Sequence, residues 1–106
     1  MGFEISGKPH SVEFTIGRIV LYERAVGHPI VASVARNAGL FTVEELATLA
    51  GYGLRSEDGE FASPSEGKEA AMRLIEEAGY RAAYDRVAEA LLRDCGFLFK
   101  ASGGKA

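Results

Sequence analysis

Two histidines are the first candidates for acid–base chemistry or metal binding, because imidazole is the side chain that titrates nearest neutral pH. His10 falls in a segment of alternating apolar and polar residues, and His28 stands before Pro29 at the start of a predicted helix. Neither has a patterned carboxylate or a cysteine near it, so we interpret His10 as an exposed turn residue and His28 as a helix-entry residue. Cys95 is the only cysteine, which excludes an intramolecular disulfide and multi-cysteine zinc sites.

Serines and carboxylates are the other groups that could do chemistry. None of the serines stands in a nucleophile-elbow sequence. The acidic pairs Glu44-Glu45, Glu57-Asp58 and Glu76-Glu77 are sequence neighbours, and neighbours on a helix point about 100° apart, so they do not converge as a catalytic pair. Gly51-Tyr52-Gly53 lacks the preceding strand and the third glycine of a dinucleotide-binding loop, and predicts a helix stop followed by a turn. We therefore expect a non-enzymatic protein with no metal and no cofactor.

Composition bounds the class of protein. The chain has 106 residues, of which 47% are hydrophobic and 25% charged, as is typical of one globular domain. Its formal net charge of -3 makes nucleic acid a poor partner, because phosphate binding needs an excess of cations. No stretch is long and apolar enough for a membrane span, and the start lacks the pattern of a secretion signal. These features predict a cytoplasmic protein that has no membrane partner.

The elements of the N-terminal half follow from periodicity. Residues 3–16 alternate between apolar and polar, which predicts a β-hairpin. After Gly17 the apolar residues cover a broad helical face, which predicts a short, largely buried helix ending at Gly27. Pro29 suits the first turn of a second helix, for which Gly39 is a left-handed stop.

Capping patterns place the next two helices. Thr42 followed by Glu45 is a capping box and predicts a third helix at about 43–50. The glycines and acids of residues 51–63 predict a loop. Ser63-Pro64-Ser65-Glu66 is a second capping box with proline at the first helical position, and it predicts the start of a fourth helix.

The fifth helix follows the break at Gly79 and runs to about Cys95. The expected fold is therefore mainly α, a helix-dominated α+β domain with about five short helices and an N-terminal β-hairpin. We expect this single domain to span residues 1–100 and to be followed by a disordered tail at residues 101–106.

The C-terminal end is more apolar than a fraying terminus requires. It either caps the core or forms an exposed apolar edge that holds a partner. For the second case the predicted partner-binding residues lie on helix five and just beyond it: Leu91, Leu92, Phe97, Leu98 and Phe99.

A helix-turn-helix is the alternative interpretation of residues 41–51, whose sequence is similar to the first helix and turn of such a unit. A following recognition helix is normally basic and polar. Here residues 56–69 hold five acids and one lysine, a charge that phosphate repels. A DNA-associated regulator therefore stays as the alternative function.

The order of the parts resembles that of a known family. The chain places a β-segment before an aromatic-glutamate pair, a glycine-leucine step after the third helix and a Leu-Ile helix that ends in glycine. These features lie at Val12–Gly17, Tyr22-Glu23, Val43–Leu54 and Ala70–Gly79. Over roughly residues 10–99 the chain resembles the small tail assembly chaperones of siphophages and of gene transfer agents, with a longer N-terminal hairpin and an aromatic C-terminal end.

The resemblance implies a function without catalysis. Such a protein coats the tape-measure protein, keeps that long hydrophobic polypeptide soluble in the host cytoplasm, recruits tail-tube subunits and leaves before virion assembly is complete. A homo-oligomer is compatible with this role. A small phage or prophage accessory protein of another kind, such as a toxin–antitoxin component, has the same layout and stays open.

Overall fold

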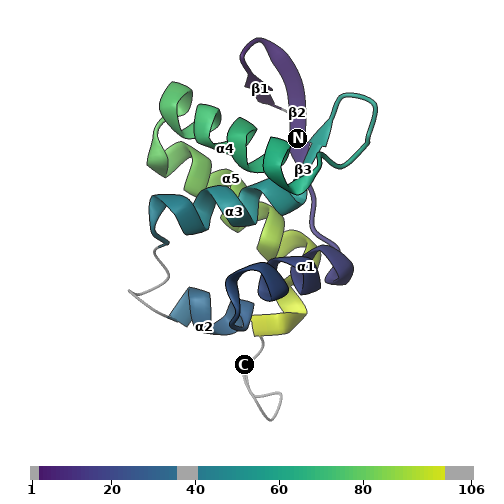
Figure 1. Ribbon diagram of the computed structural model, residues 1–106, viewed down its shortest axis with the longest axis vertical. Helices are drawn as coiled ribbons and strands as arrows, with labels where there is room; N and C mark the ends of the chain where they lie inside the picture. Colours follow the sequence, from purple (N-terminus) through teal and green to yellow (C-terminus); the bar gives the residue numbers. More distant parts are fainter. Residues whose placement is uncertain (1–2, 36–40, 100–106) are drawn as a thin grey trace.

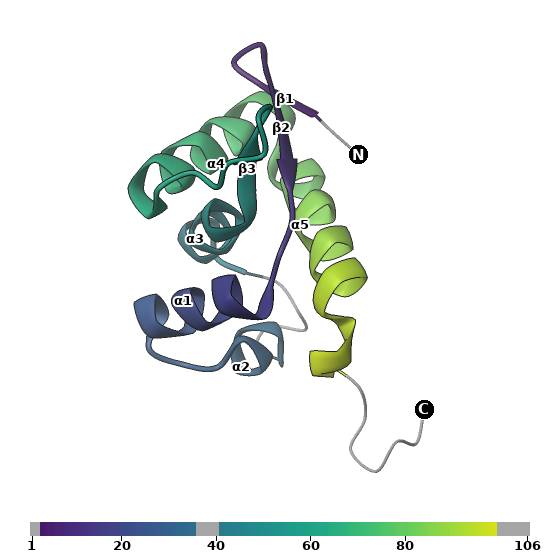
Figure 2. The same ribbon diagram turned by 90° about the vertical axis from the view of Figure 1, so that its right-hand side faces the viewer.

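The long C-terminal helix runs along one side of the molecule, and the short strands lie at one end (Figures 1 and 2). The computed structural model describes residues 3–35 and 41–99. Within them the order is β1 (Phe3–Ile5), β2 (Lys8–Val12), α1 (Ile16–Val26), α2 (Ile30–Ala35), α3 (Val43–Gly53), β3 (Leu54–Ser56), α4 (Pro64–Ala78), α5 (Tyr80–Cys95) and the 3-10 helix η2 (Gly96–Phe99). The predicted helix-dominated α+β fold is confirmed. The predicted helix stop at Gly39 and the predicted tail at residues 101–106 lie outside the described residues.

The described strands form a three-stranded antiparallel sheet in the order β1-β2-β3. The β1–β2 hairpin turns at Ser6 and Gly7, whose φ angles of 53° and 78° are both left-handed, as a tight hairpin turn requires. The second strand ends at Val12, so the prediction of strand up to residue 16 was wrong. Thr15 instead caps α1, and its hydroxyl accepts a hydrogen bond from the backbone of Arg18.

The strand β3 falls inside the segment that the sequence predicted as a loop. It pairs with β2, where Val12 lies opposite Leu54, and Arg55 forms a further bridge with Phe61. Three residues are too few to show an alternating pattern, so this strand exists only because the distant β2 supplies its hydrogen-bond partners.

The third helix begins as predicted and ends later than predicted. Thr42 and Glu45 form a complete capping box, whereas the helix continues through Gly51 to Gly53. The predicted stop at Gly51 was therefore wrong. A side chain at this position would clash with α4, since a Cβ on Gly51 would lie 2.7 Å from the backbone nitrogen of Lys68. The glycine serves close helix packing instead of helix termination.

The fourth and fifth helices form a hairpin. Ser63 caps α4 by accepting a hydrogen bond from the backbone of Glu66, and Pro64 is the first helical residue. Gly79 has φ 96° and ψ 159°, which breaks the helix and starts α5. Buried residues from the sheet and from α1 to α5 form a continuous cluster in the described part of the chain. Its largest fully buried side chains are Tyr22, Ile30, Leu46, Leu49, Leu54, Val87 and Cys95.

One end of the molecule is built from α1, α2 and the C-terminal turn of α5 with η2 (Figure 2). Two polar anchors hold these parts in place. The carboxylate of Glu23 accepts a hydrogen bond from the backbone of Ile30, the first residue of α2, at 2.9 Å. Asp94 accepts one from the backbone of Phe14 at 2.9 Å. The connection into α1 is thereby fastened to α5.

Candidate functional site

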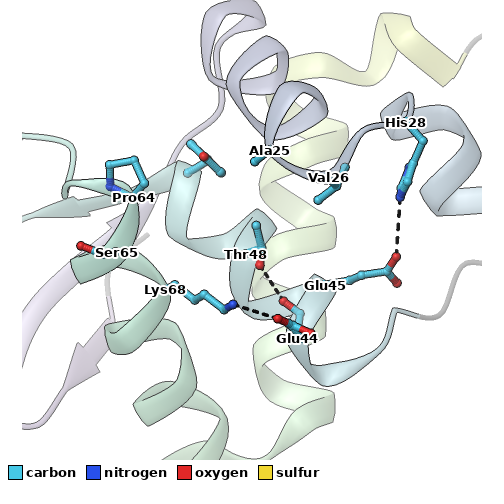
Figure 3. Close-up of a pocket in the computed structure, with 10 residues that line it drawn as sticks. Ala25, Val26, His28, Glu44, Glu45, Thr48, Pro64, Ser65 and Lys68 are labelled. Atoms are coloured by element: carbon cyan, nitrogen blue, oxygen red, sulfur yellow. Dashed lines mark hydrogen bonds and ion pairs between the residues drawn. The ribbon is translucent and has the colours of Figure 1, made fainter.

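A cleft of about 530 Å³ opens over the face of α3 (Figure 3). Its floor comes from successive turns of α3, namely Glu44, Thr48 and Tyr52, together with Glu45. The C-terminal end of α1 forms one wall through Ala25, Val26 and the following His28, and the first turns of α4 form the other through Pro64, Ser65 and Lys68. The cleft thus lies where three elements that are distant in sequence meet.

The charged groups of this cleft pair with one another. Lys68 reaches across from α4 to the carboxylate of Glu44 at 3.1 Å. His28 lies 3.8 Å from the carboxylate of Glu45, which also accepts a hydrogen bond from the backbone of Thr42. A ligand would have to displace these internal pairs. The cleft therefore offers less free binding capacity than its volume suggests.

The predicted partner-binding residues at the C-terminus fall into two groups. Leu92 and Phe97 are 63% and 55% exposed, more than the other large hydrophobic side chains that the structure describes. Leu91 is buried in the core, and Leu98 is half-buried against it. The side chain of Phe99 lies outside the described residues. A partner at this end would accordingly contact Leu92 and Phe97.

Helix α1 carries a second exposed apolar surface, which was not predicted from the sequence. The expectation that α1 is largely buried was wrong. Ile19 and Tyr22 enter the core, whereas six positions are exposed: Ile16, Gly17, Val20, Leu21, Arg24 and Ala25. We call these six residues the α1 face. A helix that is apolar nearly all round has no polar side to turn to solvent. This pattern in the sequence was therefore the signal that any part of α1 left uncovered would expose apolar side chains.

Two further residues with possible chemistry, His10 and Cys95, do not line the cleft over α3. His10 lies half-buried in strand β2 and not in a turn, so that prediction was wrong, and its Nδ1 is 2.8 Å from the backbone oxygen of Lys8. Cys95 is buried in the core, and this burial raises the pKa of its thiol, with the neighbouring Asp94 adding to the effect. Across residues 3–35 and 41–99, no group of three or more His, Cys, Asp or Glu side chains could hold a metal ion.

Arg93 and Asp94 form an ion pair that links α5 to the β2–α1 connection. Arg93 donates hydrogen bonds to both carboxylate oxygens of Asp94 and to the backbone oxygen of Val12. These bonds from Arg93, together with the bond from the Phe14 backbone, lower the pKa of Asp94 despite its partial burial. The pair joins α5 to the end of β2.

No protein-family model matches the chain, and searches of curated proteins and of solved structures give no significant match. None of the helices in the described part of the chain is both long and apolar enough to cross a membrane.

Proposed function

We propose that this protein is a tail assembly chaperone that binds the tape-measure protein of a phage, prophage or gene transfer agent and helps to recruit tail-tube subunits. The proposal combines the sequence resemblance with one structural observation. Exposed large apolar side chains gather on the elements at one end of the molecule. A protein that shields a hydrophobic polypeptide needs such a surface.

The exposed large apolar side chains are unevenly distributed over the molecule. Eight large hydrophobic residues are exposed in the described part of the chain. Six of them belong to α1, α2 or the end of α5 with η2, which lie together in Figures 1 and 2. These six are Ile16, Val20, Leu21, Val31, Leu92 and Phe97. Isolated exposed hydrophobics are ordinary, whereas their concentration on neighbouring elements favours a protein interface.

The acidic residues lie mainly elsewhere. Exposed carboxylates occupy the β3–α4 connection and the outer side of α4, at Glu57, Asp58, Glu60, Glu66, Glu69, Glu76 and Glu77. Negative charge on a surface that remains in water keeps a complex with a hydrophobic partner soluble. The same charge disfavours the DNA-associated alternative, because α4, the next helix after α3 in the chain, would bring carboxylates to phosphate.

Co-expression tests the proposal. A fragment of the tape-measure protein encoded beside this chain is produced alone and together with the full chain, and its soluble fraction is measured. We expect the fragment to become soluble and to co-purify with this protein. An unchanged insoluble fraction would remove the main support for the chaperone function. A salt-sensitive shift of duplex DNA by the purified chain would favour the DNA-associated alternative.

Matched variants show which surface of the protein solubilises the tape-measure fragment. Leu92→Glu and Phe97→Glu place a charge in the apolar C-terminal end and should reduce the recovery of the soluble fragment. Met72→Glu makes the same change at a residue of α4 that is 40% exposed, and it should leave recovery unchanged.

A further inference from the structure

We infer that the α1 face is a docking surface for an amphipathic helix whose apolar stripe is flanked by carboxylates. This inference deepens the proposed function and rests on it, because it names the surface and the chemistry of the partner segment. It also places the main contact on α1, a helix that was predicted from the sequence to be largely buried.

The first support is the composition of the α1 face. Three of its six residues are large and apolar, at Ile16, Val20 and Leu21, and Arg24 is the one that carries a charge. All of α1 lies in the described part of the chain, so this composition is complete for the helix. Ile16 is 54% exposed and Val20 37%. A solvated helix face normally carries mostly polar residues, so this one suits contact with another apolar surface.

The second support is the continuation of the surface onto α2. Val20 and Glu23 are three residues apart and share one flank of α1. Glu23 holds the backbone of Ile30, which brings the start of α2 to that flank. Val31, the next residue, is exposed. The apolar surface therefore passes from α1 to the first turn of α2, which widens it beyond a single helix.

The shape of the surface selects a helix as the partner. With 11 residues, α1 is about 16 Å long, at about 1.5 Å per residue. A partner helix of three or more turns can lie along it, with apolar residues at the i, i+3, i+4 and i+7 positions. Such a helix buries its own stripe against Ile16, Val20 and Leu21.

The charge of the α1 face indicates that the partner helix carries carboxylates. The protein carries a net charge of -3, yet the exposed positions of α1 hold a cation and no anion. A carboxylate beside the partner's stripe would pair with Arg24. Two copies joined symmetrically through α1 would instead bring two Arg24 side chains to a face whose exposed positions carry no carboxylate, because the carboxylate of Glu23 is half-buried and accepts a hydrogen bond from the backbone of Ile30. The charge pattern thus favours an acidic foreign helix over a second copy.

Binding of two synthetic peptides to the full chain tests this inference. Both have about 20 residues, about 30 Å when helical, and the same leucine stripe. One is flanked by glutamates and the other by lysines. By fluorescence anisotropy we expect the glutamate peptide to bind at least about tenfold more tightly. Equal affinity, or no binding of either peptide, would overturn the inference.

Variants of the chain then test whether the glutamate peptide binds at the α1 face. Val20→Glu should weaken the binding of the glutamate peptide about tenfold or more. Arg24→Glu should reverse the preference, so that the lysine peptide binds more tightly than the glutamate peptide. Met72→Glu is the matched control and should behave as the wild type. Ile16→Gln provides a second variant if Val20→Glu lowers thermal stability. Unchanged binding by the α1 variants, or equal loss in Met72→Glu, would contradict the assignment.

Two further outcomes separate this inference from the chaperone function. If the tape-measure fragment is solubilised and only Leu92→Glu and Phe97→Glu prevent this, the chaperone function stands and the α1 surface is wrong. If the glutamate peptide binds at α1 and the fragment stays insoluble, the surface stands and the chaperone function is wrong. Sedimentation that reveals a dimer abolished by Val20→Glu would assign the α1 face to a second copy and overturn the inference.

Discussion

Gly51 of α3 and Gly67 of α4 face each other, so that the two helices touch backbone to backbone. A Cβ on Gly51 would lie 2.8 Å from the carbonyl carbon of Gly67, and a Cβ on Gly67 would lie 3.0 Å from the Cα of Gly51. Both glycines are buried. The absence of two side chains therefore sets how closely α3 approaches α4.

Replacement of Gly67 by alanine should destabilise the protein. The new methyl group meets backbone atoms, which cannot rotate away, and such overpacking costs about 1–3 kcal/mol. Alanine has a higher helix propensity than glycine, by about 0.5–1 kcal/mol, and this gain offsets only part of the cost of overpacking. We expect a net loss of about 1–2 kcal/mol in urea unfolding. The control is Gly17→Ala in α1, where the nearest atom to the Cβ is 3.8 Å away. That variant should be neutral or more stable, and equal effects of the two would refute the close-packing argument.

Removal of the charge of Asp94 should lower stability in a pH-dependent way. The pKa of Asp94 is lowered in the folded protein, first by hydrogen bonds from Arg93. The ionised Asp94 therefore stabilises the folded protein fully at pH values above its pKa in the unfolded chain, about 3.9. This stabilisation is lost as the pH falls through the lower pKa of Asp94 in the folded protein. We expect Asp94→Asn to lose about 1–2 kcal/mol at neutral pH. Urea unfolding of both proteins should converge in strongly acidic solution. A difference that does not depend on pH would show that shape, and not charge, is responsible.

Tyr80→Phe should loosen the entry into α3. The Tyr80 hydroxyl accepts a hydrogen bond from the backbone nitrogen of Phe41 at 3.1 Å and donates one to the Phe41 oxygen at 2.7 Å. Loss of both leaves part-buried backbone groups without these partners, which costs about 1–3 kcal/mol. Amide hydrogen exchange should accelerate at Phe41 more than at Leu46 inside α3. Equal acceleration at both amides would mean that the variant destabilises the whole domain.

Phe61→Leu should release the connection between β3 and α4. The guanidinium carbons of Arg18 and Arg55 lie 4.4 Å and 5.1 Å from the centre of the Phe61 ring. Leucine keeps much of the apolar contact and removes the cation–π attraction, which is worth about 0.5–2 kcal/mol for each partly buried pair. We expect lower thermal stability and faster proteolysis within residues 56–62. Protease resistance equal to that of the wild type would indicate that backbone pairing alone holds this segment.

Local signals in the sequence determined where most helices begin. Thr42 with Glu45 and Ser63 with Pro64 satisfy backbone groups within a few residues of themselves, so their effect does not depend on the rest of the fold. The alternation of the hairpin and the break at Gly79 are local in the same sense. The helix-dominated α+β class followed from these features.

Tertiary structure alone decided the features that depend on distant partners. Gly51 carries the same local signal as a helix stop, and the approach of Gly67 from α4 keeps it inside the helix. The strand β3 needs β2 to supply its hydrogen bonds. The α1 face is equally a matter of context, because a helix that is apolar nearly all round can bury only the side that its neighbours cover. Periodicity shows that α1 is apolar, but only the packing of α2 and α3 against it determines which of its residues are left for a partner.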